Sequence, residues 1–263
     1  MKVCALIPAY NEEMTIGNIV RETKKYIDSV IVVDNGSTDA SLELIAKDFP
    51  TVQVIELGDN HGFAEGYNRA LARIDTKYFV LLNSDVEVSK NWLQPMHRAM
   101  TENPELGACG PKIRSWHRRE AFEHAGAAGG FLDKYGYPFC RGRIFNVLEK
   151  DEGQFDDNRN IFWASGACLM IRSDLYRKAG GLDPFFFAHM EEIDLNWRMH
   201  KAGYNIKYTG KSVVYHLGGG TLAYDNPRKT YLNFRNGWLM MIKNLTEYGR
   251  LNVFFRRYIM DLL

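Results

Sequence analysis

Three side chains that carry oxygen stand at alternate positions after a short apolar run. Asn83, Asp85 and Glu87 follow residues 79–82. Alternate residues of a strand face the same side, so these oxygens can converge where the strand leaves its sheet. Carboxylate and amide oxygens suit Mg²⁺ or Mn²⁺. This stretch indicates either a divalent cation site or an ordinary polar turn.

A second acidic group begins a stretch with helical spacing near residue 191. Glu191, Glu192 and Asp194 follow an aromatic loop at residues 183–190. Acidic residues at a helix start can simply complement the helix dipole. A carboxylate beside apolar aromatic rings would also have a raised pKa, which suits a general base. His216, at the end of a short apolar run and before three glycines, is either a structural histidine or a further ligand.

The elements that must position these residues alternate regularly. Apolar strand-like runs at 3–7, 30–33, 52–57 and 79–82 are separated by helical stripes, about every 25 to 30 residues. This pattern predicts an α/β fold with a mostly parallel, doubly wound sheet and helices on both faces. Polar turns after the strands would share one edge, where ligands of such sheets gather. Neither G-x-G-x-x-G after the first strand nor a Walker A motif occurs, which argues against dinucleotide oxidoreductases and P-loop enzymes.

Composition sets outer limits. The chain has 263 residues, 46% apolar and 25% charged, with a net charge of +1, so charge gives no case for a nucleic-acid partner. The four cysteines have no metal-binding spacing and are expected to be reduced in a cytosolic protein. The N-terminus enters a strand directly, so no signal peptide is expected. No run reaches the ~18 apolar residues of a membrane-spanning helix.

Two regions interrupt the regular pattern. Residues 114–160 are rich in glycine, basic and aromatic residues, and we expect an irregular insertion with a mobile binding loop. Strand character returns at 161–171, where Gly166 indicates a close approach of backbone or ligand. Residues 229–263 predict two amphipathic helices, which would pack on the main domain, form a dimer surface or lie on an anionic membrane. Because the sequence stops inside an apolar run, we expect a longer natural chain.

Five motifs in order resemble family 2 glycosyltransferases with the GT-A fold, in particular the bacterial rhamnosyltransferase-like members. They occupy residues 7–13, 32–39, 60–63, 81–85 and 191–194. The resemblance covers about residues 1–220. It implies a nucleotide-binding half at 1–88, an acceptor-binding half at 89–220 and a C-terminal helical segment at 221–263.

The resemblance also implies roles for individual residues. Nucleotide-sugar contacts fall on Pro8, Tyr10, Glu12, Asp34, Gly62, Asn68, Asn83 and Ser84. Among these, Asp34 would accept a hydrogen bond from the pyrimidine ring. Asp85 would bind the metal, with Glu87 and His216 as further ligands. Glu192 stands at the position of the catalytic base, with Glu191 and Asp194 as alternatives.

The activity implied is inverting transfer of a hexosyl or deoxyhexosyl group from a UDP- or dTDP-linked donor. The acceptor would be a glycan or lipid-linked glycan in surface polysaccharide synthesis, and the cofactor Mg²⁺ or Mn²⁺. The enzyme would be cytoplasmic or peripheral on the inner membrane face, as a monomer or homodimer. Two alternatives stay open: a sugar nucleotidyltransferase, and a binding protein that has lost catalysis. The acidic pair Glu12–Glu13 after the first strand argues against the former, which needs a basic, glycine-rich loop there.

Overall fold

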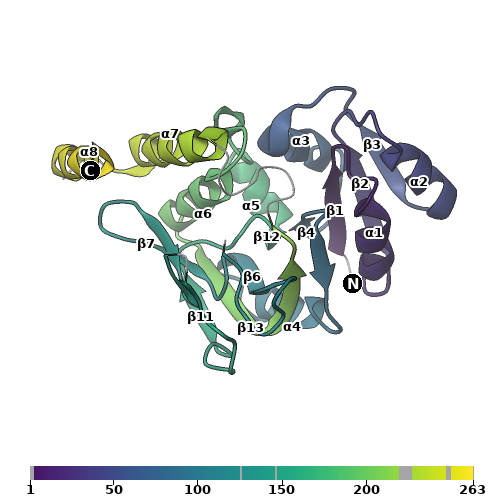
Figure 1. Ribbon diagram of the computed structural model, residues 1–263, viewed down its shortest axis with the longest axis horizontal. Helices are drawn as coiled ribbons and strands as arrows, with labels where there is room; N and C mark the ends of the chain where they lie inside the picture. The colour runs from purple at the N-terminus through teal and green to yellow at the C-terminus, as the bar shows by residue number, and fades with distance from the viewer. Residues whose placement is uncertain (1–2, 125, 146, 219–226, 247–249, 263) are drawn as a thin grey trace.

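A computed structural model describes residues 3–124, 126–145, 147–218, 227–246 and 250–262. It is an α/β protein in which helices cover both faces of a central sheet (Figure 1). The strands of this sheet are β1 (Val3–Ala9), β2 (Ser29–Asp34), β3 (Gln53–Glu56), β4 (Tyr78–Leu82), β5 (Val86–Val88), β6 (Leu106–Ser115), β11 (Asn158–Ile161), β12 (Cys168–Arg172) and β13 (Asn205–His216).

Helices occupy most of the connections between these strands. They are α1 (Ile16–Lys24), α2 (Ser41–Asp48), α3 (Gly62–Leu71), α4 (Leu93–Glu102), α5 (Ser173–Lys178), the short 3₁₀ helix η1 (Pro184–Phe186), α6 (Glu191–Lys201), α7 (Pro227–Asn244) and α8 (Arg250–Leu262).

The predicted mostly parallel sheet is confirmed. The order along the sheet is β11-β13-β6-β12-β4-β1-β2-β3, with β5 paired to β13. Strands β3, β2, β1 and β4 are parallel, and β12 is antiparallel to both β4 and β6. Because β12 is antiparallel to both β4 and β6, β6 runs in the same direction as the N-terminal strands. β13 is parallel to β6 and shares that direction. The carboxyl ends of β1, β2, β4 and β13 therefore lie on one edge.

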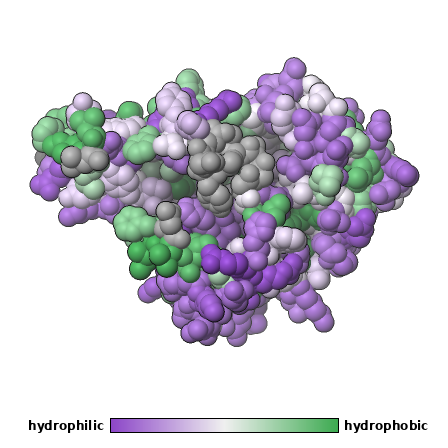
Figure 2. Space-filling model, in the orientation of Figure 1, coloured by the Kyte–Doolittle hydropathy of each residue, from purple (hydrophilic) through white to green (hydrophobic). Residues whose placement is uncertain are grey.

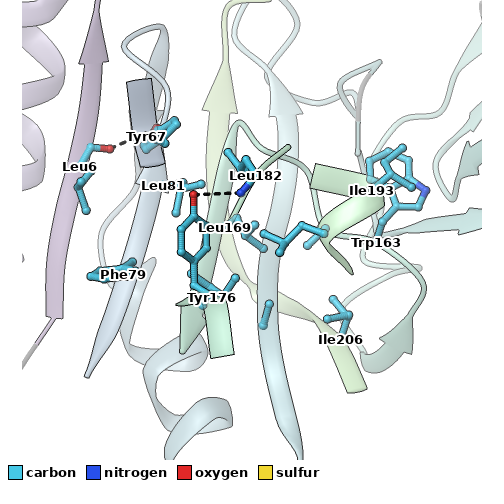
Figure 3. Close-up of a cluster of buried hydrophobic side chains, with 14 of the residues drawn as sticks. Leu6, Tyr67, Phe79, Leu81, Trp163, Leu169, Tyr176, Leu182, Ile193 and Ile206 are labelled. Atoms are coloured by element: carbon cyan, nitrogen blue, oxygen red, sulfur yellow. Dashed lines mark hydrogen bonds between the residues drawn. The ribbon is translucent and has the colours of Figure 1, made fainter. Parts of the chain in front are cut away.

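Each face of the sheet has its own hydrophobic core, as the period-two alternation of a strand requires. On β1, Cys4 and Leu6 face one core, whereas Ala5 and Ile7 face the other. The first core is closed by α3, α5 and α6, and Figure 3 shows part of it around Leu81 and Leu169. The second is closed by α1, α2 and α4. All four cysteines are free and buried, in agreement with the expectation of reduced thiols.

The expectation of an irregular insertion at 114–160 was wrong in part. Described residues of this stretch form β7 (Gly130–Leu132), β8 (Pro138–Cys140), β9 (Arg143–Ile144), β10 (Val147–Leu148) and the start of β11. A buried ion pair anchors the region, because Lys112 on β6 donates to Asp151 at 2.8 Å, and both side chains are almost fully buried. The expected strand at 161–171 is likewise two strands, β11 and β12, separated by a turn around Gly166.

The two C-terminal helices exist as predicted, and α7 lies against α6 and η1. The proposed boundary at 220 and 221 falls outside the described residues. Of the helices in the described part of the chain, none is both long and apolar enough to cross a membrane.

The buried ion pair generates a prediction about stability. Asp151→Ala should lower the free energy of unfolding by about 3 kcal/mol, because it leaves the buried Lys112 ammonium with only the partly exposed Asp156. Urea denaturation measures this loss. The matched control is Asp157→Ala, which removes the more exposed partner of Arg141 and should cost less than about 1 kcal/mol. Equal losses in the two variants would contradict the assignment.

Candidate functional site

The two acidic residues that follow β4, Asp85 and Glu87, contact different partners. The strand ends at Leu82 and β5 begins at Val86, so the extended run expected through Glu87 is interrupted by a turn. Glu87 accepts hydrogen bonds from Arg119 and from the Trp116 indole, at 2.5 and 3.0 Å. Asp85 instead contacts His216 on β13. The structure thus brings together two of the three expected metal ligands and engages Glu87 elsewhere.

His216 lies between two carboxylates. Its Nε2 is 3.2 Å from Asp85 Oδ1, and its Nδ1 is 3.6 Å from Glu123 Oε1. Burial alone would disfavour the imidazolium, but these two carboxylates outweigh it and raise the pKa of His216 to about 10. Glu123 was not among the sequence candidates, because it lies in the glycine-rich stretch where no periodic pattern marks it.

The donor types in this cluster fit a divalent cation. Asp85 and Glu123 offer carboxylate oxygens and His216 an imidazole nitrogen, a set that suits Mn²⁺. Within the described residues, no group of three or more His, Cys, Asp or Glu side chains has the arrangement of a complete metal site. One or two protein ligands suffice where substrate phosphates supply the rest. Ligation by His216 would require loss of its proton.

The carboxyl ends of β1 and β2 form the second part of the edge. Asp34 ends β2, and its buried carboxylate accepts from the backbone N–H groups of Gly36 and Ser37 at 3.1 and 3.2 Å. The next residue, Asn35, donates to Gly62 O and accepts from His61 N, which joins this turn to the start of α3. A small apolar pocket lies beside it, lined by Pro8, Val33, Asn35, Gly62, Phe63, Gly66 and Tyr67.

Other expected nucleotide contacts have different surroundings. Tyr10 is exposed at this edge, and Glu12 accepts a hydrogen bond from Thr15 Oγ1 at 2.5 Å. Asn68 is committed to the fold, because it donates to Leu182 O and accepts from Leu182 N and Tyr176 Oη. These contacts use the polar atoms of its side chain, so the expected nucleotide contact of Asn68 is not favoured.

Glu191 and Glu192 form a carboxyl pair in the first turn of α6. Burial raises the pKa of Glu191 well above that of an ordinary glutamate, and the neighbouring charge of Glu192 adds to the effect. Burial also raises the pKa of Glu192, although backbone N–H groups, including that of Gly166, partly offset it. One carboxyl oxygen of each residue is buried without a hydrogen-bond partner. A pair of this kind can hold and release a proton.

The turn before β12 connects this pair to the β4 end. Ala167 O accepts from Asn83 N at 3.0 Å, and the neighbouring Gly166 hydrogen bonds to Glu192. A Cβ on Gly166 would lie 3.8 Å from Cβ of Glu192. This is an ordinary van der Waals contact, as is the 3.5 Å from the same position to Phe63, so the structure shows no close backbone approach at Gly166. Asn83 Oδ1 is buried without a partner beside this turn.

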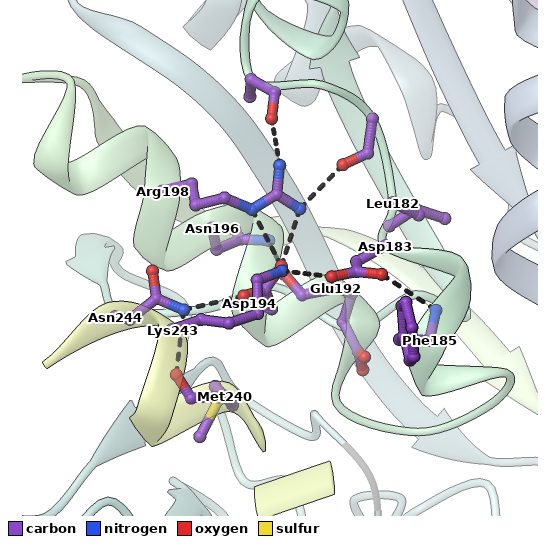
Figure 4. Close-up of polar contacts among 12 residues, drawn as sticks. Leu182, Asp183, Phe185, Glu192, Asp194, Asn196, Arg198, Met240, Lys243 and Asn244 are labelled. Carbon is purple, nitrogen blue, oxygen red and sulfur yellow. Dashed lines mark hydrogen bonds and ion pairs between the residues drawn. The ribbon is translucent and has the colours of Figure 1, made fainter. Parts of the chain in front are cut away.

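Asp194, the third acid of α6, has a different environment. Its fully buried carboxylate accepts from Arg198, Lys243 and Asn244 at 2.8, 2.9 and 2.7 Å (Figure 4). Arg198 also donates to Ala179 O and Gly181 O. Three donors hold this carboxylate inside the protein, which favours a structural role over that of a base.

Comparisons with known proteins agree with this arrangement. The family model described as Glycosyl transferase family 2 matches residues 4–180. The chain is 28% identical over 203 residues to the N-acetylglucosaminyl-diphospho-decaprenol L-rhamnosyltransferase of Mycobacterium tuberculosis, covering 72% of this chain and 66% of that protein. It is 22% identical over 240 residues to the low-salt glycan biosynthesis hexosyltransferase Agl10 of Haloferax volcanii, covering 89% and 73%.

Among solved structures, the chain resembles the mannosyltransferase PcManGT of Pyrobaculum calidifontis in complex with GDP-Man and Mn²⁺. The TM-score is 0.66 at 14% identity, over 98% of this chain and 69% of that one. This likeness shows a shared fold and confirms the expected GT-A architecture. The family model covers both the sheet edge at Asp34 and the β4 end at Asp85, and on that match the chain belongs to glycosyl transferase family 2.

Proposed function

We propose that the protein is an inverting glycosyltransferase that uses Glu192 as its general base. The observation that carries this proposal is the buried Glu191–Glu192 pair, which contacts the turn at Gly166 and has raised pKa values. A raised pKa brings a carboxylate closer to the pH at which it exchanges protons with a substrate hydroxyl. Asp194 is instead paired with the cations Arg198 and Lys243.

The chemical step needs few groups. Glu192 takes the proton of the acceptor hydroxyl while the oxygen of that hydroxyl bonds to the anomeric carbon of the donor sugar. The bond between that carbon and the diphosphate oxygen breaks on the opposite face, which inverts the configuration. Burial and the neighbouring charge of Glu192 raise the pKa of Glu191, because two adjacent buried carboxylates resist double ionisation.

Asp85 and His216 would hold a divalent cation, Mg²⁺ or Mn²⁺, at the diphosphate. Such a cation stabilises the negative charge of the leaving diphosphate. Asn83 and Ser84 stand in the same turn and would contact the donor beside it. Asp34 would accept from a pyrimidine ring N–H, which favours a UDP- or dTDP-linked donor, and Pro8 and Gly62 line the adjoining pocket. The segment 1–88 would accordingly serve as the nucleotide-binding half.

The acceptor proposal rests on the relatives. One is named for rhamnosyl transfer to a lipid diphosphate acceptor and another for glycan biosynthesis. We therefore assign this chain a glycan or lipid-linked glycan acceptor in surface polysaccharide synthesis, bound by the segment 89–220. Because the mycobacterial match spans 66% of that relative, this assignment is a proposal for the segment described.

Substitution of the base tests the proposed chemistry. Glu192→Gln should lower kcat for release of nucleoside diphosphate at least about 100-fold, because an amide takes no proton. It should not lower the free energy of unfolding, because it removes a buried carboxyl that burial already disfavours. The control is Glu102→Gln, an exposed glutamate on α4, which should keep full activity. Full turnover in Glu192→Gln would refute its role and move the base to Glu191.

Thermal shift tests donor and metal together. UDP-glucose, dTDP-rhamnose and GDP-mannose are compared with and without Mn²⁺, and a ligand at 100 times its Kd should stabilise the fold by about 2.7 kcal/mol. Asp85→Ala should remove the Mn²⁺-dependent part of the shift. Glu87→Ala should keep it, because Glu87 is bound by Arg119 and Trp116. Loss of the Mn²⁺-dependent part only in Glu87→Ala would reverse this metal assignment.

The exposed face of α8 favours a contact with a membrane surface. Five of its exposed apolar side chains recur at helical spacing, and a sixth, Met260, is also exposed; the five are Leu251, Phe255, Tyr258, Ile259 and Leu262. Figure 2 shows apolar atoms at the left end of the molecule, where Figure 1 draws α8. Arg250 and Arg256 lie on the same helix, and basic residues beside an apolar stripe suit an anionic lipid surface. We propose that α8 docks the enzyme on such a surface, where a lipid-linked acceptor resides.

Vesicle binding tests the α8 proposal. Phe255→Glu should reduce co-sedimentation with phosphatidylglycerol vesicles at least about tenfold, because a buried phenylalanine contributes about 1.5 to 3 kcal/mol. Met14→Glu, which changes another exposed apolar residue, near α1, is the control and should bind normally. Wild-type protein that ignores the vesicles, or a dimer in light scattering that Phe255→Glu dissociates, would show that α8 contacts a second copy instead.

A further inference from the structure

A buried asparagine on α7 contacts three backbone carbonyl oxygens of the loop that precedes the candidate base. The side chain of Asn236 is fully buried, and its Nδ2 lies 2.9, 2.8 and 2.8 Å from the carbonyl oxygens of Phe186, Ala188 and His189. Its Oδ1 accepts from Arg235, which also donates to Phe185 O. Three carbonyls at one point require a donor group, so the amide nitrogen must face them.

The loop that carries these carbonyls has an unusual backbone. Phe187, His189 and Met190 have φ values of 62°, 70° and 72°, in the left-handed region that residues with a Cβ rarely adopt. Each such residue costs of order 1 to 3 kcal/mol and persists only where its surroundings determine it. With this backbone conformation, the carbonyl oxygens of residues 186, 188 and 189 all face Asn236 on α7. Asn236 is the group that receives them.

The same loop joins the two halves of the candidate site. On one side, Met190 immediately precedes Glu191 and Glu192, and Met190 O accepts from Asp194 N in the first turn of α6. On the other side, Phe187 O accepts from Phe63 N at 3.1 Å. A Cβ on Gly62 would lie 2.8 Å from the Phe187 ring, so that ring rests on the residue beside the donor pocket.

We infer that Asn236 is a positioning residue for catalysis, which holds the 186–190 loop so that the Glu191–Glu192 pair faces the donor. This inference rests on the proposed function for its catalytic meaning. It assigns a role to a helix that lies beyond residue 180, the end of the family-model match. The contact with the reacting atoms belongs to Glu192, and Asn236 acts through the loop.

Kinetics with two variants test this role. Asn236→Leu removes both N–H donors, and Asn236→Asp keeps the volume while replacing the donors with a carboxyl group. Both should lower kcat at least tenfold for dTDP-rhamnose or UDP-glucose, whichever is turned over. The Kd for UDP with Mn²⁺ should stay within twofold, because Asp34 and Asp85 are held by other contacts. The control is Leu232→Ala, a buried residue of α7 that should reduce stability and keep kcat within twofold.

Hydrogen exchange tests the loop separately from the chemistry. Amides of residues 185–190 should exchange at least tenfold faster in Asn236→Leu, while β1 to β4 and the Leu232→Ala variant keep wild-type rates. Unchanged exchange together with unchanged kcat would overturn the inference. A wild-type protein that turns over neither donor would refute the proposed function, whereas the exchange rates would still decide whether Asn236 holds the loop.

Discussion

A buried carboxylate must be neutralised, and much of the second half of the molecule is arranged around one such group. Asp194 lies at the start of α6 with no access to water, and its partners come from α6 itself and from α7. Lys243 also reaches Asp183, which caps the 3₁₀ turn before the candidate base. Removal of the Asp194 carboxylate would leave Arg198 and Lys243 without their shared buried counter-charge. The helix, the aromatic loop and α7 are therefore held as one unit.

Three acids begin the same helix, and their neighbours separate their properties. Asp194 has cationic and amide donors around it, whereas Glu191 and Glu192 each keep one buried carboxyl oxygen without a hydrogen-bond partner. The helix dipole acts on all three and cannot distinguish them. Burial without a counter-charge raises the pKa of a carboxyl group, whereas a nearby cation opposes that rise. A single turn of helix thus carries one carboxylate that is fully hydrogen-bonded and one pair that is not.

The sequence predicts those parts of the fold and the site that depend on the spacing of apolar and polar residues along the chain. Alternating strands and helical stripes placed β1 to β4, and the strand ends placed Asp34 and Asp85 on one edge. The pairing of distant residues was not predictable, because Asn68 meets Leu182 and Glu87 meets Arg119 only after folding. The same reason hid Glu123 and Asn236, whose partners lie 93 and about 50 residues away in sequence. Side-chain roles of this kind depend on tertiary contacts that no local signal encodes.

The position of β13 in the sheet has a consequence for how the protein folds. The β1–β2 and β2–β3 pairs join strands that are close in sequence, so they need only short loop closures. β13 pairs with β6 and β5 about 100 residues or more earlier in the chain, and its last residue is His216. During synthesis, the first half can therefore assemble well before β13 is available. The Asp85–His216 contact would then be among the last to form, so a chain stalled before that point would hold Asp85 on a folded sheet edge while still lacking His216.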